Sequence, residues 1–235
     1  MNIVLVLAGG TGSRLGADIP KQYIEVDGKP IISYCLSLLA EHKRVDGIQI
    51  VADEMWREFI QNKMYQEEVN ESYRRKFKGF SKPGKNRQLS ILEGLKDIRA
   101  YAEASDGVVV HDAVRPCVTK KLISECLDAL EGHDAVVPVL PMKDTVYYSE
   151  DKMKISSLLE RSHVFAGQAP EAFKLEVYYK ANVVLLPNRI LNINGAMEPA
   201  VLAGMDVVMI PGEEENFKIT TKADLEHFRK RCEEI

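Results

Sequence analysis

The opening of the chain, MNIVLVLAGGTGSRLG, constrains the fold more than any other stretch. Residues 3–7 are β-branched residues and leucines, a short apolar run that is typical of a strand buried on both faces inside a parallel sheet. A glycine-rich loop follows directly, at residues 8–16. Because glycine has no Cβ, the backbone of such a loop can turn tightly and bring its N–H groups close to an anion. The opening therefore predicts an α/β protein with an anion-binding loop after its first strand.

Two cations accompany this loop. Arg14 lies inside it, and Lys21 follows after Pro20, whose ring stiffens the approach to the lysine. Glycines combined with fixed cations suit a polyphosphate better than a neutral ligand. An ordinary strand-to-helix turn is the alternative, but such a turn does not require these cations.

The spacing excludes two common phosphate loops. A Walker motif requires Lys-Ser or Lys-Thr after a glycine at a fixed distance, and the sequence has none. Gly10, Gly12 and Gly16 are spaced one residue too widely for the dinucleotide-binding fingerprint.

The rest of the chain alternates strand and helix patterns, which predicts a mainly parallel, Rossmann-like sheet flanked by helices. The helix at 53–69 is expected to be capped by Asp53 and to bury Met55, and the prolines of the strand at 134–141 favour an edge or a bend. The predicted strands are 47–52, 73–78, 107–110, 134–141 and 206–210, with a β-hairpin at 144–155; the predicted helices are 31–40, 53–69, 89–100, 120–130, 175–185, 196–203 and one from 222.

Composition narrows the class of protein. A length of 235 residues, 46% hydrophobic and 28% charged, is normal for a single α/β domain with a substantial core. The net charge of −4 and the absence of a basic tail argue against a general nucleic-acid or membrane-surface role. The opening apolar run has no positive leader and is too short for a signal peptide, which favours a cytoplasmic protein. The four cysteines form no C-x-x-C pair and are interpreted as reduced structural thiols.

Two later loops carry further candidate site residues. In SKPGKNRQLS, Gly84 and Arg87 precede a predicted helix, and the N-terminus of a helix is a ready site for an anion; a solvated basic turn is the alternative. In HDAVRP, Asp112 follows a buried strand, at the edge where ligands of α/β sheets collect. A lone aspartate there is more often a helix cap, but a carboxylate at this point can also hold Mg²⁺.

These motifs together resemble a known enzyme family. LAGGTGSRLG followed by Pro-Lys-Gln resembles the signature of nucleotidyltransferases that join a nucleoside triphosphate to a phosphorylated alcohol or sugar. The Pro-Lys-Gln form and HDAVRP are most similar to the polyol-phosphate cytidylyltransferases, which act on methylerythritol phosphate or ribitol 5-phosphate, and the Ala-Val form looks like the ribitol-type branch. The resemblance covers nearly the whole chain. It implies the nucleotide-diphospho-sugar transferase fold, CTP and a phosphorylated alcohol as substrates, and Mg²⁺ as cofactor.

The resemblance also implies a role for particular residues. Lys218, in NFKIT, matches a family lysine and joins Arg14 and Lys21 as a catalytic cation. Asp112 is the implied metal ligand. The implied nucleotide-binding residues are Leu7, Ala8, Gly9, Gly10, Thr11, Gly12, Gly84, Arg87, Ser90, Asp112 and Ala113. The implied acceptor-binding residues are Arg115, Thr145, Arg161 and Gln168.

Quaternary structure is implied in the same way. In the family, a β-arm projects from the core and clasps a second subunit, and it corresponds here to about residues 139–163 of a single domain spanning 1–235. Thr145 and Arg161 then reach the acceptor site of the partner. The resemblance therefore implies a homodimer with shared sites.

The chain departs from the family pattern at two places near the expected acceptor. Ala169 stands where the family has a threonine, and Gly195 stands where it has an aspartate. These departures leave ribitol 5-phosphate and a glycerol phosphate open as acceptors, with methylerythritol phosphate as the runner-up. A sugar-phosphate nucleotidyltransferase that uses UTP or dTTP, and an inactive binding protein, are the remaining alternatives; both lysines and Asp112 argue against the latter.

Overall fold

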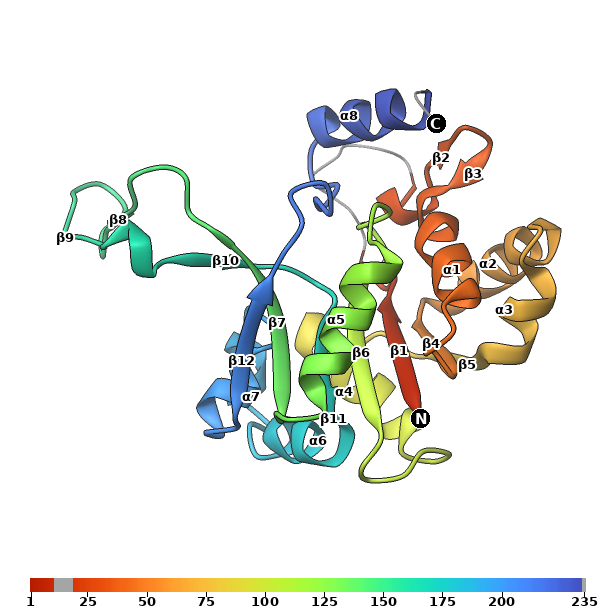
Figure 1. Cartoon of the computed structure of the whole chain (residues 1–235), viewed down its shortest axis with the longest axis horizontal. Coiled ribbons are helices and arrows are strands. Elements are labelled where there is room, and N and C mark those ends of the chain that lie inside the picture. The colour runs from red at the N-terminus through yellow and green to blue at the C-terminus, as the bar shows by residue number, and fades with distance from the viewer. Residues whose placement is uncertain (11–18, 234–235) are drawn as a thin grey trace.

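A mainly parallel sheet forms the centre of the molecule (Figure 1). The computed structural model describes residues 1–10 and 19–233, and in this part of the chain the central sheet has eight strands. They are β1 (Asn2–Leu7), β4 (Gly47–Val51), β5 (Phe77–Ser81), β6 (Gly107–Asp112), β7 (Ala135–Pro141), β10 (Phe165–Gly167), β11 (Glu171–Lys174) and β12 (Val207–Pro211). Their order is β10-β7-β11-β6-β1-β4-β5, with β12 also paired to β7.

Strand β1 lies in the interior of this sheet, as the sequence predicts. It runs parallel to β4 on one side and to β6 on the other. Alternate side chains of a strand point to opposite faces, so Val4 and Val6 pack in one core cluster while Ile3 and Leu5 pack in another. Both faces are therefore buried, which explains the uninterrupted apolar run.

Helices cover the two faces of the sheet. Helices α1 (Ile31–Glu41) and α5 (Lys120–Leu130) contribute to the core cluster of Val4 and Val6, and α4 (Arg87–Ile98) and α6 (Leu175–Val183) contribute to that of Ile3 and Leu5. The other α-helices of the described residues are α2 (Glu54–Gln66), α3 (Asn70–Lys76), α7 (Glu198–Leu202) and α8 (Lys222–Glu233). Among the described residues, no helix is both long enough and apolar enough to cross a lipid bilayer.

The segment between β7 and β10 leaves the body of the molecule as an arm, which we define as residues 142–164 (Figure 1). It carries the two-stranded hairpin of β8 (Tyr147–Tyr148) and β9 (Ser157–Leu158), in which Tyr147 lies opposite Leu158. A second small hairpin, β2 (Glu25–Val26) with β3 (Lys29–Pro30), follows a 3-10 turn at Lys21–Tyr23.

Three local predictions were wrong. Residues 73–76 form the end of helix α3 rather than a strand, because Tyr73 is buried against Tyr65 and Phe77, and the buried Lys76 ammonium donates to the His42 carbonyl at 2.6 Å.

The other two concern burial and sheet position. Asp53 does cap α2, but Met55 is 75% exposed because it lies on the face of that helix turned away from the core. Of the two alternatives predicted for strand β7, an edge or a bend, the edge is wrong, since its residues Ala135 and Val136 pair with both β11 and β12.

Candidate active site

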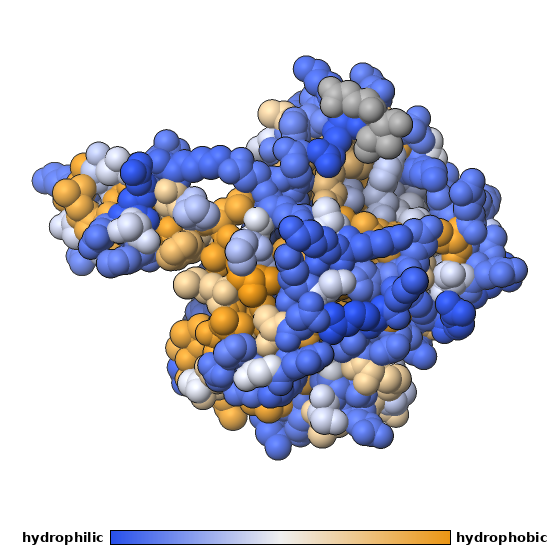
Figure 2. All heavy atoms as spheres, viewed as in Figure 1, coloured by the Kyte–Doolittle hydropathy of each residue, from blue (hydrophilic) through white to orange (hydrophobic). Residues whose placement is uncertain are grey.

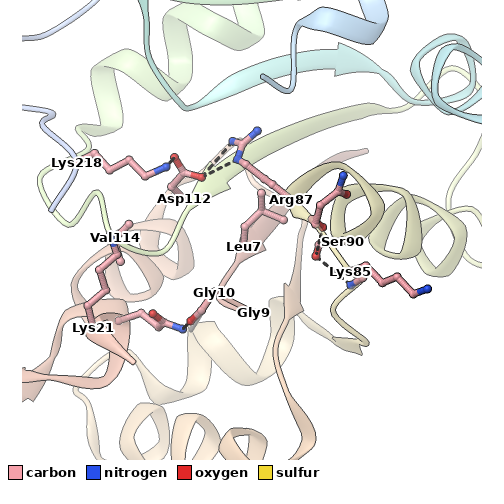
Figure 3. Close-up of a pocket in the computed structure, with 13 residues that line it drawn as sticks. Leu7, Gly9, Gly10, Lys21, Lys85, Arg87, Ser90, Asp112, Val114 and Lys218 are labelled. Carbon is pink, nitrogen blue, oxygen red and sulfur yellow. Dashed lines mark hydrogen bonds and ion pairs between the residues drawn. The ribbon is translucent and has the colours of Figure 1, made fainter. Parts of the chain in front are cut away.

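A cavity of about 450 Å³ opens beyond the carboxyl ends of β1 and β6 (Figure 3). Leu7 and Asp112, the last residues of these neighbouring strands, are paired in the sheet and both line the cavity. The lining residues are Leu7, Gly9, Gly10, Lys21, Gln22, Gly84, Lys85, Asn86, Arg87, Ser90, Asp112, Val114 and Lys218. Ligands of α/β folds bind beyond the carboxyl ends of the parallel strands, so this cavity is the candidate active site.

The start of the glycine loop is held in place from behind by its own sequence neighbourhood. The buried Gln22 amide donates hydrogen bonds to the carbonyls of Ala8 at 2.6 Å and Gly10 at 2.8 Å, and the Tyr23 hydroxyl donates to Ala8 at 3.0 Å. These bonds fix the backbone of residues 8–10 before any ligand is present. Gln22 was given no role in the sequence analysis. Its position directly after Lys21, in the Pro-Lys-Gln motif, was the one signal that pointed to it.

The second loop needs glycine at one position. A Cβ on Gly84 would lie 2.4 Å from the Leu89 Cβ and 2.8 Å from the Ser90 backbone nitrogen, so no larger residue fits without moving the backbone. The Ser90 hydroxyl accepts a hydrogen bond from the Gly84 N–H at 3.0 Å and donates one to the Asn86 carbonyl at 2.9 Å. Gly84 and Ser90 therefore shape the loop beside the cavity.

Asn86 anchors this loop at two points. Its side-chain oxygen accepts from the Leu89 N–H at 2.8 Å and so caps helix α4. Its side-chain amide donates to the carbonyls of Ile190 at 3.0 Å and Leu191 at 3.3 Å, in the 3-10 turn Arg189–Asn192. Sequence reasoning did not single out Asn86, because its long-range partners cannot be read from local pattern.

Asp112 is the centre of the charge arrangement. It is 6% exposed, and its carboxylate lies 2.9 Å from the Lys218 Nζ and 3.1 Å from an Arg87 guanidinium nitrogen, the two cations approaching from opposite sides (Figure 3). The Arg115 guanidinium is 3.7 Å away. Burial alone would raise the pKa of Asp112, but Arg87, Lys218 and Arg115 outweigh it and hold this pKa well below its usual range. Asp112 is thus ionised at neutral pH.

A second buried carboxylate lies next to this group. Glu171, the first residue of β11, is 8% exposed and lies 3.7 Å from the guanidinium of Arg87. Burial raises the pKa of Glu171 to about 7; Arg87 opposes this shift and the neighbouring Asp112 adds to it. Sequence reasoning gave Glu171 no role, because nothing in its local pattern indicates its proximity to Arg87.

Several predicted nucleotide-site residues come together here. Lys21 lines the cavity and donates to the Ile219 carbonyl at 2.7 Å. The predicted catalytic residue Lys218 lines it too, together with the predicted nucleotide-binding residues Leu7, Gly9, Gly10, Gly84, Arg87, Ser90 and Asp112; Ala8 and Ala113 are buried and do not. Thr11, Gly12 and Arg14 lie outside the described residues.

The predicted acceptor residues are not among the cavity lining of the single chain, although Arg115 lies beside Asp112. Arg115 is largely buried and donates to the Asn216 carbonyl at 2.6 Å. The buried Gln168 side-chain amide donates to the Glu213 carbonyl at 3.0 Å and accepts from the Glu213 N–H at 3.1 Å. Thr145 and Arg161 are exposed on the arm, where Arg161 donates to the Lys143 carbonyl at 2.9 Å. None of the four lines the cavity, so their role in acceptor binding stays a prediction.

Comparison with known proteins decides the family. The model of the 2-C-methyl-D-erythritol 4-phosphate cytidylyltransferase (IspD) family matches residues 2–229. The chain belongs to this family. It is therefore a cytidylyltransferase, a CTP-dependent nucleotidyltransferase, as the resemblance predicted.

Relatives of this cytidylyltransferase include enzymes with different named acceptors. A 2-C-methyl-D-erythritol 4-phosphate cytidylyltransferase of Clostridium botulinum is 33% identical, with 94% of each chain covered. A ribitol-5-phosphate cytidylyltransferase of Streptococcus agalactiae is 29% identical, over 97% of this chain and 94% of the relative. The bifunctional ribulose 5-phosphate reductase/CDP-ribitol pyrophosphorylase of Haemophilus influenzae is 31% identical over 95% of this chain, which spans 46% of that protein's length.

Solved structures agree with the fold. The 4-diphosphocytidyl-2C-methyl-D-erythritol synthase of Anaerococcus prevotii matches with a TM-score of 0.82 and 25% identity, over 99% of this chain and 96% of that one. The mainly parallel α/β architecture predicted from the sequence is confirmed.

The residues of this cytidylyltransferase suit a magnesium ion that arrives with a nucleotide. Within residues 1–10 and 19–233, no group of three or more His, Cys, Asp or Glu side chains could hold a metal alone. Mg²⁺ is commonly bound by only one or two protein carboxylates, with substrate phosphates and water completing its coordination. Asp112 is buried, ionised and lines the cavity, so it has the charge and the position that such a carboxylate ligand requires.

Proposed function

We propose that this cytidylyltransferase transfers the cytidylyl group of CTP to a phosphorylated short polyol, of the ribitol 5-phosphate or glycerol phosphate type, and releases pyrophosphate. The observation that carries the proposal is the cavity itself. It brings Lys21, Asp112 and Lys218, which are far apart in the sequence, to one place beside two glycine-containing loops.

The proposed reaction forms a bond between a phosphate oxygen of the acceptor and the α-phosphorus of CTP. The bond from the α-phosphorus to the bridging oxygen of the β-phosphate breaks, and its electrons leave with pyrophosphate. The attacking oxygen is already anionic at neutral pH, so no strong general base is needed. The barrier is the approach of two anions and the charge that grows on the leaving group.

Fixed positive groups address this barrier. Lys21 and Lys218 would hold the phosphates in the cavity, and Arg14 would add a third cation. The backbone of residues 9–10, held by Gln22, would approach the nucleotide closely. Asp112 would hold Mg²⁺, which when bound supplies further charge neutralisation at the phosphates.

The acceptor is the less constrained part of the proposal. The relative from Streptococcus is named for ribitol 5-phosphate, the one from Haemophilus for ribulose 5-phosphate and CDP-ribitol, and the one from Clostridium for methylerythritol phosphate. In this chain Ala169 is buried, and a Cβ added to Gly195 would meet no atom within 4 Å. As alanine and glycine, these residues offer a polyol neither the hydroxyl nor the carboxylate of the family pattern.

We also propose that the protein acts as a homodimer. The arm exposes apolar side chains at Tyr147, Met153, Ile155 and Leu158, and Figure 2 shows hydrophobic residues gathered on the arm and around its base. A second copy of the chain would cover this surface and would bring Thr145 and Arg161 toward a neighbouring cavity.

A direct assay tests the activity. Purified protein with Mg²⁺ and either CTP or UTP is offered ribitol 5-phosphate, glycerol 3-phosphate or methylerythritol phosphate in turn, and pyrophosphate release is measured. We expect release with CTP and with ribitol 5-phosphate or glycerol 3-phosphate, and none when the acceptor is omitted. If methylerythritol phosphate were the only acceptor to give turnover, the proposed acceptor would be wrong. A preference for UTP over CTP would overturn the choice of nucleotide.

A further inference from the structure

Glu171 is a buried carboxylate for which the proposed reaction has no direct use. It lies at the start of β11, which is inserted antiparallel between β6 and β7. It does not line the cavity. Its neighbour Arg87 does, and the guanidinium of Arg87 lies 3.1 Å from Asp112 and 3.7 Å from Glu171.

Arg87 is therefore shared between two carboxylates. Asp112, in turn, is shared among Arg87, Lys218 at 2.9 Å and Arg115 at 3.7 Å. A metal ion that binds Asp112 must compete with these cations, because one carboxylate has a limited number of oxygen lone pairs. Arg87 can be released from Asp112 at low cost only if another anion remains beside it, since a buried charge without a partner is strongly unfavourable.

We propose that Glu171 is a positioning residue that retains the Arg87 guanidinium when Asp112 engages a divalent cation. The inference rests on the proposed function, because it takes Asp112 as the magnesium ligand. Glu171 touches neither the metal nor the nucleotide; it acts through Arg87. Glu171 thereby keeps the charged Arg87 side chain paired and in place while Asp112 binds the metal.

The test is the effect of Mg²⁺ on CTP affinity in Glu171→Gln. Glutamine has nearly the same shape and can still accept a hydrogen bond, so the substitution removes mainly the charge. The matched control is Glu176→Gln, because Glu176 also pairs with an arginine, Arg99, at 2.8 Å, but on α6 and outside the cavity lining. CTP binding is measured by calorimetry at pH 8.5, once in EDTA and once across a Mg²⁺ titration.

We expect the two conditions to respond differently. In EDTA, the Kd of CTP for Glu171→Gln should stay within about twofold of wild type or become tighter, because the site gains net positive charge. The Mg²⁺ concentration that half-maximally tightens CTP binding should rise by about tenfold, as expected when the residues that support a metal ligand from behind are disturbed. Glu171→Asp, which keeps the charge, should restore most of the wild-type response.

Two results would overturn the proposal. One is a Mg²⁺ response of Glu171→Gln equal to that of wild type and Glu176→Gln. The other is a loss of CTP affinity in EDTA as large as the loss in Mg²⁺, which would mean that the substitution only disturbs the fold. Failure of the proposed function is seen separately, as wild-type protein that does not bind CTP or does not release pyrophosphate.

Discussion

The Lys218 ammonium lies 2.9 Å from the Asp112 carboxylate and so ties the segment after β12 to the end of β6. The adjacent residue, Ile219, accepts a hydrogen bond from the Lys21 ammonium at 2.7 Å through its carbonyl. The two-residue stretch 218–219 therefore organises two of the three lysines that line the cavity: it supplies Lys218 and holds Lys21. The positive side of the cavity is built before any phosphate arrives.

This arrangement makes Lys21 a direct test of the phosphate-binding role. Lys21→Ala removes one preorganised cation, and by analogy with the loss of a single transition-state donor it should lower kcat on the order of 10²–10³-fold. The measurement is pyrophosphate release at saturating CTP and acceptor. Lys29→Ala is the control, since Lys29 is an exposed lysine of β3 that pairs with Glu67 at 2.6 Å. Normal turnover of Lys21→Ala would show that this lysine does not stabilise the transition state.

Gly84 gives a steric test of the second loop. In Gly84→Ala the new Cβ would overlap backbone atoms of Leu89 and Ser90, at 2.6 and 2.8 Å, and these atoms can move only with the loop. We expect the KM for CTP to rise by about tenfold or more, because misplaced binding groups are costly in phosphoryl transfer. Gly132→Ala, where a Cβ meets nothing within 4 Å, should leave the KM unchanged. An unchanged KM in Gly84→Ala would mean that this loop does not contact the nucleotide.

The sequence predicted the parts of the site that depend on local pattern. Asp112 was found because it follows a buried strand, and Gly84 because it precedes a helix in a basic loop; both line the cavity. Gln22 and Glu171 were given no role, because their contacts with Gly10 and Arg87 appear only once the chain is folded. A side chain that acts through another residue leaves no motif of its own.

The errors in the fold have a similar cause. The pattern at residues 73–78 predicts a charged strand, but the packing of Tyr73 and the buried contact of Lys76 with His42 keep residues 73–76 in helix α3, and strand β5 begins only at Phe77. The prolines of β7 favour an edge or a bend, but β11 and β12 pair with its two sides, so the edge alternative is wrong. In both places long-range partners override the local signal.

The raised pKa of Glu171 predicts a pH dependence of stability. Its ordinary pKa is 4.5 and its folded-state pKa is about 7, so between these values the folded protein keeps a proton that the unfolded chain has lost. The contribution of protonated Glu171 to the free energy of unfolding is fully present below about pH 4.5. It is lost as the pH rises through 7, by at most about 1.4 kcal/mol per pH unit. The depressed pKa of Asp112 acts only at lower pH, outside this window.

Urea unfolding of wild type and Glu171→Gln at pH 5, 6, 7 and 8 measures this effect. Glutamine does not titrate, so the variant should not lose this stability. The free energy of unfolding of the variant minus that of wild type should therefore increase as the pH rises from 5 to 8. Glu176→Gln should follow the wild-type pH dependence. Parallel curves for wild type and Glu171→Gln would contradict a raised pKa at this residue.

The arm provides the last prediction, which concerns assembly. Leu158 is 70% exposed at the tip hairpin, opposite Tyr147, and an apolar surface of this kind is expected to be covered by a second copy of the chain. Leu158→Asp should therefore convert a dimer to a monomer in light scattering at micromolar concentration. Activity should fall with it, because Thr145 and Arg161 of the same arm would no longer reach a partner's cavity. Met55→Asp, at an equally exposed apolar residue on α2, should leave the dimer intact, and a wild-type protein that is monomeric at this concentration would refute the assignment.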